Sequence, residues 1–141
     1  MATFDNRLSA ISYPDSGRRV SILERQLDCG TDNQAQNDIV QMLNIPAGTF
    51  VEAVAITVDT AEGGTLTIDV GDGDGAQVYL AGAEGNAAAT LFGDASTGTA
   101  AIAATAVQKY YTAADVLTLS IKSAAADTAK ITLRAKVVNW A

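Results

Sequence analysis

The alternation of apolar and polar residues is the dominant pattern of the chain from Asp38 onward. It is clearest in three segments, residues 65–70, 116–122 and 130–137. A period of two places successive side chains on opposite faces of a β-strand, so that one face can be buried. We therefore predict strands in these segments, with a core formed by Leu66, Ile68, Val70, Leu117, Leu119, Ile121, Ile131, Leu133, Ala135 and Val137.

Further strands are expected between these segments, at residues 39–45, 50–58, 77–80, 90–92 and 101–107. In the first of them, alternation places Ile39, Gln41, Leu43 and Ile45 on one face. Short strands at intervals of roughly 8–12 residues, without a strand–helix–strand rhythm, are typical of sandwiches and barrels. We predict an all-β fold, an antiparallel two-sheet β-sandwich, with the jelly roll as one candidate topology.

The first 37 residues have a more polar and irregular texture. We predict that residues 1–37 form an extended N-terminal arm with one or two short strands, and that residues 38–141 form the sandwich domain. The run Tyr13-Pro14-Asp15-Ser16-Gly17 is a strong turn signal. The arm also holds more apolar residues than a free tail normally does: Leu8, Ile11, Tyr13, Val20, Ile22, Leu23 and Leu27.

Four arginines lie in this arm: Arg7, Arg18, Arg19 and Arg25. They fit two interpretations. In one, the arm is an ordinary solvated segment. In the other, it binds a partner by bidentate arginine contacts to acidic surfaces of a neighbouring subunit.

The composition excludes most catalytic chemistry. The chain has no histidine and one cysteine, Cys29. It therefore has no intrachain disulfide, and it lacks the residues of most zinc sites and of histidine-activated nucleophiles. We predict that the protein is not an enzyme and has no cofactor.

The charge and hydropathy of the chain bear on its partners. A net charge of −7 argues against binding to nucleic acid. Residues 45–98 carry eight acidic residues and no basic one, whereas residues 99–141 carry five basic and two acidic ones. This split fits either the solvated faces of one domain or charge complementarity between subunits. We expect no membrane partner and a cytoplasmic site of assembly, because the chain shows neither a secretory signal nor an apolar run of about 20 residues.

The segment Asp69-Val70-Gly71-Asp72-Gly73-Asp74-Gly75 is the candidate for metal chemistry. Asp69, Asp72 and Asp74 could bind Ca²⁺ as a weak site. The spacing fails the EF-hand pattern, because Ala76 falls where the third ligand is required. The competing interpretation is a β-turn in which Asp and Gly accept unusual backbone angles.

Several runs resemble small virion proteins of tailed bacteriophages, of the head decoration (cement) type. They are residues 43–51, Ala61–Asp72, Tyr111–Asp115 and the closing strand Lys130–Val138. The resemblance covers residues 38–141 and rests on short turn motifs.

This resemblance implies a β-sandwich that forms oligomers, often trimers, and clamps major capsid protein subunits together on the virion. Assembly would take place in the host cytoplasm. Two other functions stay open: a tail, neck or head-fibre protein, and a carbohydrate- or Ca²⁺-binding sandwich module.

Overall fold

The computed structural model describes residues 19–86, 89–92 and 108–139. Within these ranges the chain forms strands and no helix, and so no helix is long and apolar enough to cross a membrane there. The strands are β1 (Arg19–Asp28), β2 (Ile39–Ile45), β3 (Thr49–Thr60), β4 (Thr67–Asp72), β5 (Gly75–Glu84), β6 (Ala89–Phe92), β7 (Lys109–Tyr111), β8 (Asp115–Lys122) and β9 (Lys130–Asn139). The predicted strand at 101–107 lies outside the described residues.

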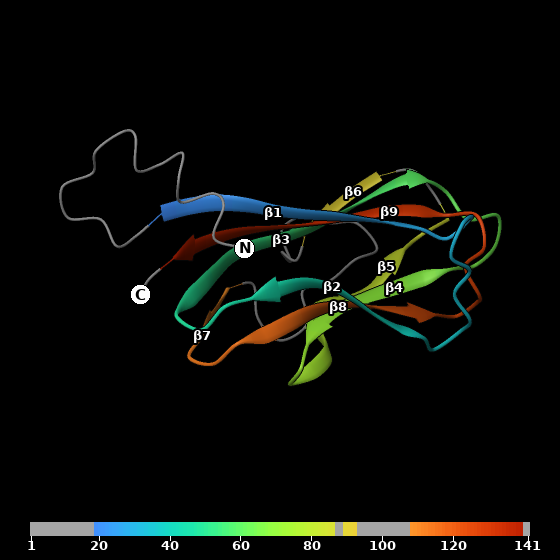
Figure 1. Ribbon diagram of the computed structural model, residues 1–141. Helices are drawn as coiled ribbons and strands as arrows, with labels where there is room; N and C mark the ends of the chain where they lie inside the picture. The colour runs from blue at the N-terminus through green and yellow to red at the C-terminus, as the bar shows by residue number, and fades with distance from the viewer. Residues whose placement is uncertain (1–18, 87–88, 93–107, 140–141) are drawn as a thin grey trace.

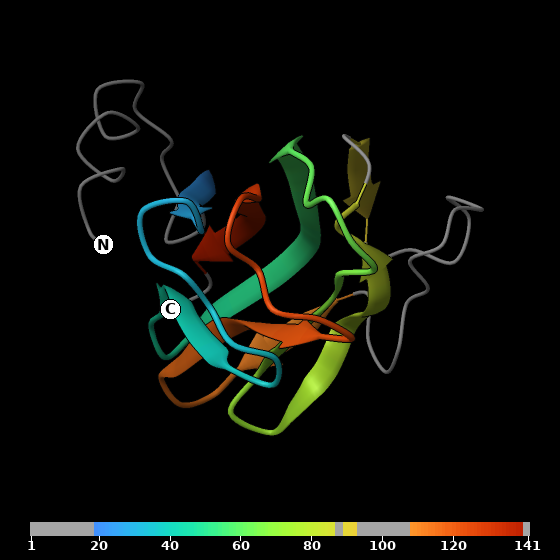
Figure 2. The ribbon, with the colours of Figure 1, turned by 90° about the vertical axis from the view of Figure 1, so that its right-hand side faces the viewer.

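The strands form two antiparallel sheets that face each other (Figure 1). The first sheet has the order β1-β9-β3-β6, and β7 also pairs with β3. The second has the order β2-β8-β4-β5. Viewed along the strands, the two layers enclose a single core (Figure 2). The prediction of an antiparallel two-sheet sandwich is confirmed.

The core is built from the predicted alternating faces. Leu66, Ile68 and Val70 are fully buried, and the inward residues of β8 and β9 are buried with them. Burying a Val, Leu or Ile side chain contributes about 1.5–3 kcal/mol each. Because both sheets supply such apolar side chains on their inner faces, the burial of these faces holds the sandwich together.

The predicted arm is wrong for its described part, residues 19–37. β1 pairs with β9 along its whole length, from Arg19 opposite Asn139 to Asp28 opposite Lys130. Leu27 and Cys29 are buried in the core. The physical reason is that a strand at the edge of the first sheet buries these apolar side chains and gains a ladder of backbone hydrogen bonds. Residues 1–18 lie outside the described part, and their role as an arm stays a prediction.

A buried carboxylate joins two loops at one end of the sandwich. Glu62 follows β3, and its Oε1 accepts the backbone N–H groups of Asp127, Thr128 and Ala129 at 3.0–3.1 Å. Burial raises the pKa of Glu62, but these donors favour the charged form more strongly, so its pKa lies below the usual value.

Replacing Glu62 with alanine is expected to destabilise the protein by about 2–3 kcal/mol at neutral pH, because three N–H groups, two of them part-buried and that of Ala129 buried, lose their acceptor. The depressed pKa means that this stabilisation is present above the unfolded-state pKa, about 4.3, and is lost as the pH falls through the lower folded value. Urea unfolding at pH 7 and pH 3 measures both effects. The control is Glu84→Ala, an exposed site where a change within about 0.5 kcal/mol is expected; equal losses would contradict the role of Glu62.

Candidate functional site

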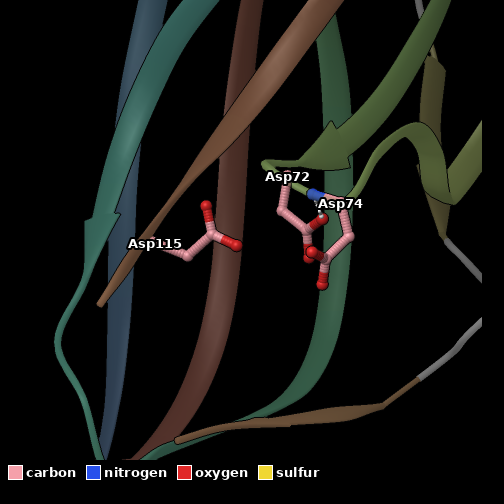
Figure 3. A group of neighbouring side chains, drawn as sticks. All are labelled: Asp72, Asp74 and Asp115. Carbon is pink, nitrogen blue, oxygen red and sulfur yellow. Dashed lines mark hydrogen bonds between the residues drawn. The ribbon is translucent and has the colours of Figure 1, made fainter. Parts of the chain in front are cut away.

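Three carboxylates meet at the end of the β4–β5 hairpin. Asp72 and Asp74 flank Gly73 in the hairpin turn, and Asp115 begins β8 (Figure 3). One oxygen of each lies within 4.8 Å of the others. Local backbone bonds explain the arrangement: Asp72 Oδ1 accepts the N–H of Asp74 at 2.8 Å, and Asp115 Oδ1 accepts the N–H of Gly73 at 3.0 Å.

The ammonium group of Lys109 lies against two of these carboxylates. Its Nζ is 2.7 Å from Asp72 Oδ2 and 2.6 Å from Asp74 Oδ2. The Asp72 side chain is fully buried, whereas that of Lys109 is 24% exposed. Burial raises the pKa of Asp72, but the hydrogen bonds from Lys109 and Tyr111 lower it more, so its pKa lies below the usual value. Burial alone would lower the pKa of Lys109, and the two carboxylates raise it above the usual value.

Two tyrosines extend this network into the core. Tyr111 donates its hydroxyl proton to Asp72 Oδ2 at 2.5 Å, and the Tyr79 and Tyr111 hydroxyls are 2.6 Å apart. Since the Tyr111 proton is directed to Asp72, Tyr79 is the donor of the second bond. Burial raises the pKa of Tyr79 to about 12 and raises that of Tyr111 as well. The network therefore crosses from the second sheet to the first with a buried carboxylate at its centre.

Asp69 is separate from this cluster. Between the pairs Val70–Leu80 and Ile68–Ala83, β5 has one residue more than β4, which is a β-bulge opposite Asp69. Asp69 Oδ1 accepts the N–H of Gly82 at 2.8 Å, and its Oδ2 accepts Gln77 Nε2 at 3.1 Å. Gly82 has a φ of 68°, which glycine adopts without strain. Asp69 thus accepts a hydrogen bond from a backbone N–H group within the bulge. The predicted set of Asp69, Asp72 and Asp74 is therefore not brought together, and Asp72 and Asp74 lie beside Asp115 instead.

A cavity of about 660 Å³ opens beside the cluster. Asp69, Asp74, Gln77 and Lys109 are among the residues that line it. The carboxylates of Asp69 and Asp74 and the ammonium of Lys109 already have partners within the chain. The Lys122 ammonium also lines the cavity; it lies 3.5 Å from the neutral Asn37 Oδ1 and has no ion-pair partner in the described part of the chain. A cation at the cluster would have to compete with Lys109.

Part of the uneven charge of the chain is paired within the fold. Arg134 Nε lies 2.7 Å from Glu24 Oε2, and Lys136 Nζ lies 2.9 Å from Glu52 Oε1. Together with Lys109, these pairs join basic residues of the C-terminal third to acidic residues of β1, β3 and the β4–β5 turn. The two described arginines of the predicted arm do not form a cluster, because Arg19 and Arg25 are six residues, or about 20 Å, apart on β1. Arg7 and Arg18 lie outside the described residues.

A row of apolar side chains crosses the outer face of the first sheet. In register, Val20 of β1 lies opposite Val138 of β9, which lies opposite Phe50 of β3, which lies opposite Tyr110 of β7. Ile22 is two residues further along β1. Val20, Ile22 and Tyr110 are 51%, 58% and 45% exposed. We call these five residues the apolar row.

Sequence reasoning missed both features for the same reason. The Lys109 network and the apolar row join residues that are 30 or more positions apart, and no local spacing connects them. For the network, the sequence signal was the pair Asp72 and Asp74; for the apolar row, it was the pair Val20 and Ile22, which shares one face of a strand.

The fold has counterparts among solved structures. A chain in the capsid of Ralstonia phage GP4 has a TM-score of 0.64 and 20% identity, over 91% of this chain and 89% of that one. A chain in the acidic stable capsid structure of Helicobacter pylori bacteriophage KHP30 has a TM-score of 0.58 and 18% identity, over 86% and 92%. A chain in the cyanophage Pam1 capsid asymmetric unit has a TM-score of 0.55 and 20% identity, over 90% and 89%.

The matches cover most of each chain, so this chain shares its fold with these chains from phage capsids. At 18–20% identity, the likeness is one of fold. No family model matches the chain, and no curated protein matches it.

Proposed function

We propose that the protein is a structural component of a bacteriophage virion, and specifically a non-enzymatic capsid cement protein. In this role it binds the outer capsid surface as an oligomer and stabilises contacts between major capsid protein subunits. The observation that carries the proposal is the similarity, over 86–91% of the chain, to chains in three phage capsids.

The strand order supports a jelly-roll classification within this proposal. With β7 set aside, eight strands form two four-stranded sheets, β1-β9-β3-β6 and β2-β8-β4-β5. All but one of the connections between these eight strands cross from one sheet to the other, and the exception is the β4–β5 hairpin. Jelly rolls, which occur in viral capsid proteins, are double-sheet folds of eight strands.

The chemistry of the described residues favours a binding role over catalysis. The Cys29 thiol is buried, and burial together with Glu62 raises its pKa to about 11, so it stays protonated and unreactive at neutral pH. At the acidic cluster, Lys109 already pairs with Asp72 and Asp74, which favours a structural role over a Ca²⁺-binding one. The apolar row, in which Val20, Ile22 and Tyr110 are exposed, is the kind of surface that proteins use to bind other proteins.

A symmetric oligomer fits this role. The resemblance to cement proteins implies a homotrimer, and a closed ring presents several copies of one binding surface to the shell. A protein that binds the assembled shell and not its free subunits stabilises the shell by mass action.

Capsid shells of the same phage, assembled without the protein, test the proposal. Added protein is expected to bind them at a fixed stoichiometry and to raise their disruption temperature by several degrees, measured by scanning calorimetry and electron microscopy. Failure to bind shells, or labelling confined to the tail or neck, would overturn the cement role. Binding that needs Ca²⁺ and is abolished by a chelator would favour the binding-module alternative.

The binding segment can be tested with the same shells. Removal of residues 1–17 is expected to weaken shell binding at least tenfold while leaving the sandwich folded. The deletion has to end before Arg19, because β1 is part of the first sheet. An unchanged affinity for the shells would show that the N-terminal segment is not part of the proposed interface.

A further inference from the structure

The edges of the two sheets differ in how they are protected. An edge strand presents unpaired N–H and C=O groups that can pair with another chain, and bulges or short strands blunt this tendency. In the second sheet, β2 has a bulge at Met42 and β5 leaves the register of β4 at two places. At the far side of the first sheet, β6 and β7 have four and three residues.

β1 has neither form of protection. It pairs with β9 without a register shift through all ten of its residues, and β9 is its only strand partner among the described residues. Val20 and Ile22, both more than half exposed, lie on its outer face and begin the apolar row. Arg19 Nε, at the start of the same strand, is buried and has no hydrogen-bond acceptor in the described part of the chain. In the described part of the chain, this end of β1 therefore has both a free edge and exposed apolar side chains suited to a partner.

The chain itself contains a segment suited to this edge. Residues 1–18 join the described structure at Arg19, beside the apolar row, and can span up to roughly 60 Å when extended. Within them, Ile11 and Tyr13 are two positions apart, so they share a face of any strand they form. An antiparallel strand that places Ile11 opposite Ile22 and Tyr13 opposite Val20 would cover both exposed side chains.

The register favours a segment from another copy. If Pro14–Gly17 formed a four-residue hairpin loop, Tyr13 of the same chain would lie opposite Arg18 and Ile11 opposite Val20. Ser9 would then lie opposite Ile22 and leave it poorly covered. A segment from a second copy is not held to that register. Successive head-to-tail contacts of this kind form a ring when the rotation between neighbouring subunits closes.

We propose that the free edge of β1 binds residues 8–13 of a second copy of the chain as an added antiparallel strand. This contact would join the subunits of the oligomer, would bury Val20 and Ile22, and would bring polar groups near Arg19. The inference concerns the free protein, so its test needs no capsid and its failure is distinct from failure of the cement role.

Disulfide trapping between two single-cysteine additions tests the contact. Ile11→Cys is made in a chain with a long tag and Ile22→Cys in an untagged chain, and the two are mixed, allowed to exchange and oxidised. Side chains directly opposite on paired strands are close enough for a disulfide, so the mixed dimer is expected to be the main product on a non-reducing gel. Cys29 is buried and does not compete.

The matched control pairs Ile11→Cys with Ile39→Cys, because Ile39 is an equally exposed apolar residue, 64% exposed, on the edge strand of the other sheet. This mixture is expected to give at least tenfold less mixed dimer. Equal yields from both mixtures would overturn the proposal. So would a chain carrying both Ile11→Cys and Ile22→Cys that forms its disulfide only within one molecule, or a full-length protein that light scattering finds to be monomeric.

Discussion

Replacing Lys109 with methionine is expected to destabilise the protein by about 3–5 kcal/mol at neutral pH, the usual cost of removing one partner of a buried ion pair. Asp72 is fully buried, and Lys109 is the cation that compensates its charge. Methionine has a similar length but leaves the carboxylate with only neutral donors, the Tyr111 hydroxyl and the backbone N–H of Asp74. Chemical unfolding followed by circular dichroism measures the loss.

The pH dependence of this loss separates electrostatics from packing. In the natural protein the pKa of Asp72 is depressed, so its stabilisation is present above the unfolded-state pKa, about 3.9, and is lost as the pH falls through the lower folded value. In the Lys109→Met variant the effect of burial dominates, and the pKa of Asp72 is expected to lie above its usual value. Protonation of Asp72 then removes the unpaired buried charge from the variant. The difference in stability between the variant and the natural protein therefore shrinks as the pH is lowered towards 4.

Two controls sharpen this result. Lys136→Met removes a lysine whose ion pair with Glu52 is partly exposed, with side chains 44% and 35% exposed, and a loss of at most about 1 kcal/mol is expected. Adding Asp72→Asn to Lys109→Met removes the unpaired charge and is expected to recover part of the stability. Equal losses at positions 109 and 136, or a Lys109→Met deficit that does not change with pH, would show that the buried pair is not the cause.

The sequence predicted the inner faces of the sandwich because burial imposes a strict period of two. The predicted core residues of β4, β8 and β9 are all buried. The prediction for residues 39–45 was partly wrong for a definite reason. A bulge at Met42 shifts the alternation, so Leu43 and Ile45 are buried while Ile39 is exposed. Bulges depend on the partner strand, and so a single segment does not reveal them.

The candidate site was harder to predict, because the sequence shows charges without their partners. Asp69, Asp72 and Asp74 lie within six residues of the chain, and their spacing suggested one metal site. The fold sends Asp69 to the bulge in β5 and brings Lys109 to Asp72 from 37 positions away. Long-range strand pairing decided which carboxylates meet, and no property of residues 69–75 alone carries that information.

Replacing Gly71 with alanine is expected to destabilise the protein by about 3 kcal/mol or more, the upper end of the range for overpacking. Between the pairs Val70–Leu80 and Asp72–Gly75, β4 has one residue, Gly71, while β5 has four. The β5 backbone therefore passes over Gly71. A Cβ at this position would lie 2.0 Å from the carbonyl oxygen of Gly75 and 2.5 Å from the carbonyl carbon of Ala76. Because these are backbone atoms, a side-chain rotation cannot relieve the contact, and the hairpin that positions Asp72 has to move.

The control is Gly64→Ala, since a Cβ on Gly64 would meet nothing within 4 Å. That change is expected to be neutral or slightly stabilising, because alanine reduces the conformational entropy of the unfolded chain. Thermal unfolding of the two variants beside the natural protein measures the difference. Displacement of the hairpin should also separate Asp72 from Lys109, so Gly71→Ala and Lys109→Met should not be additive. If the two changes add fully, or if Gly71→Ala is as stable as Gly64→Ala, the close approach of β5 to Gly71 does not hold the buried ion pair in place.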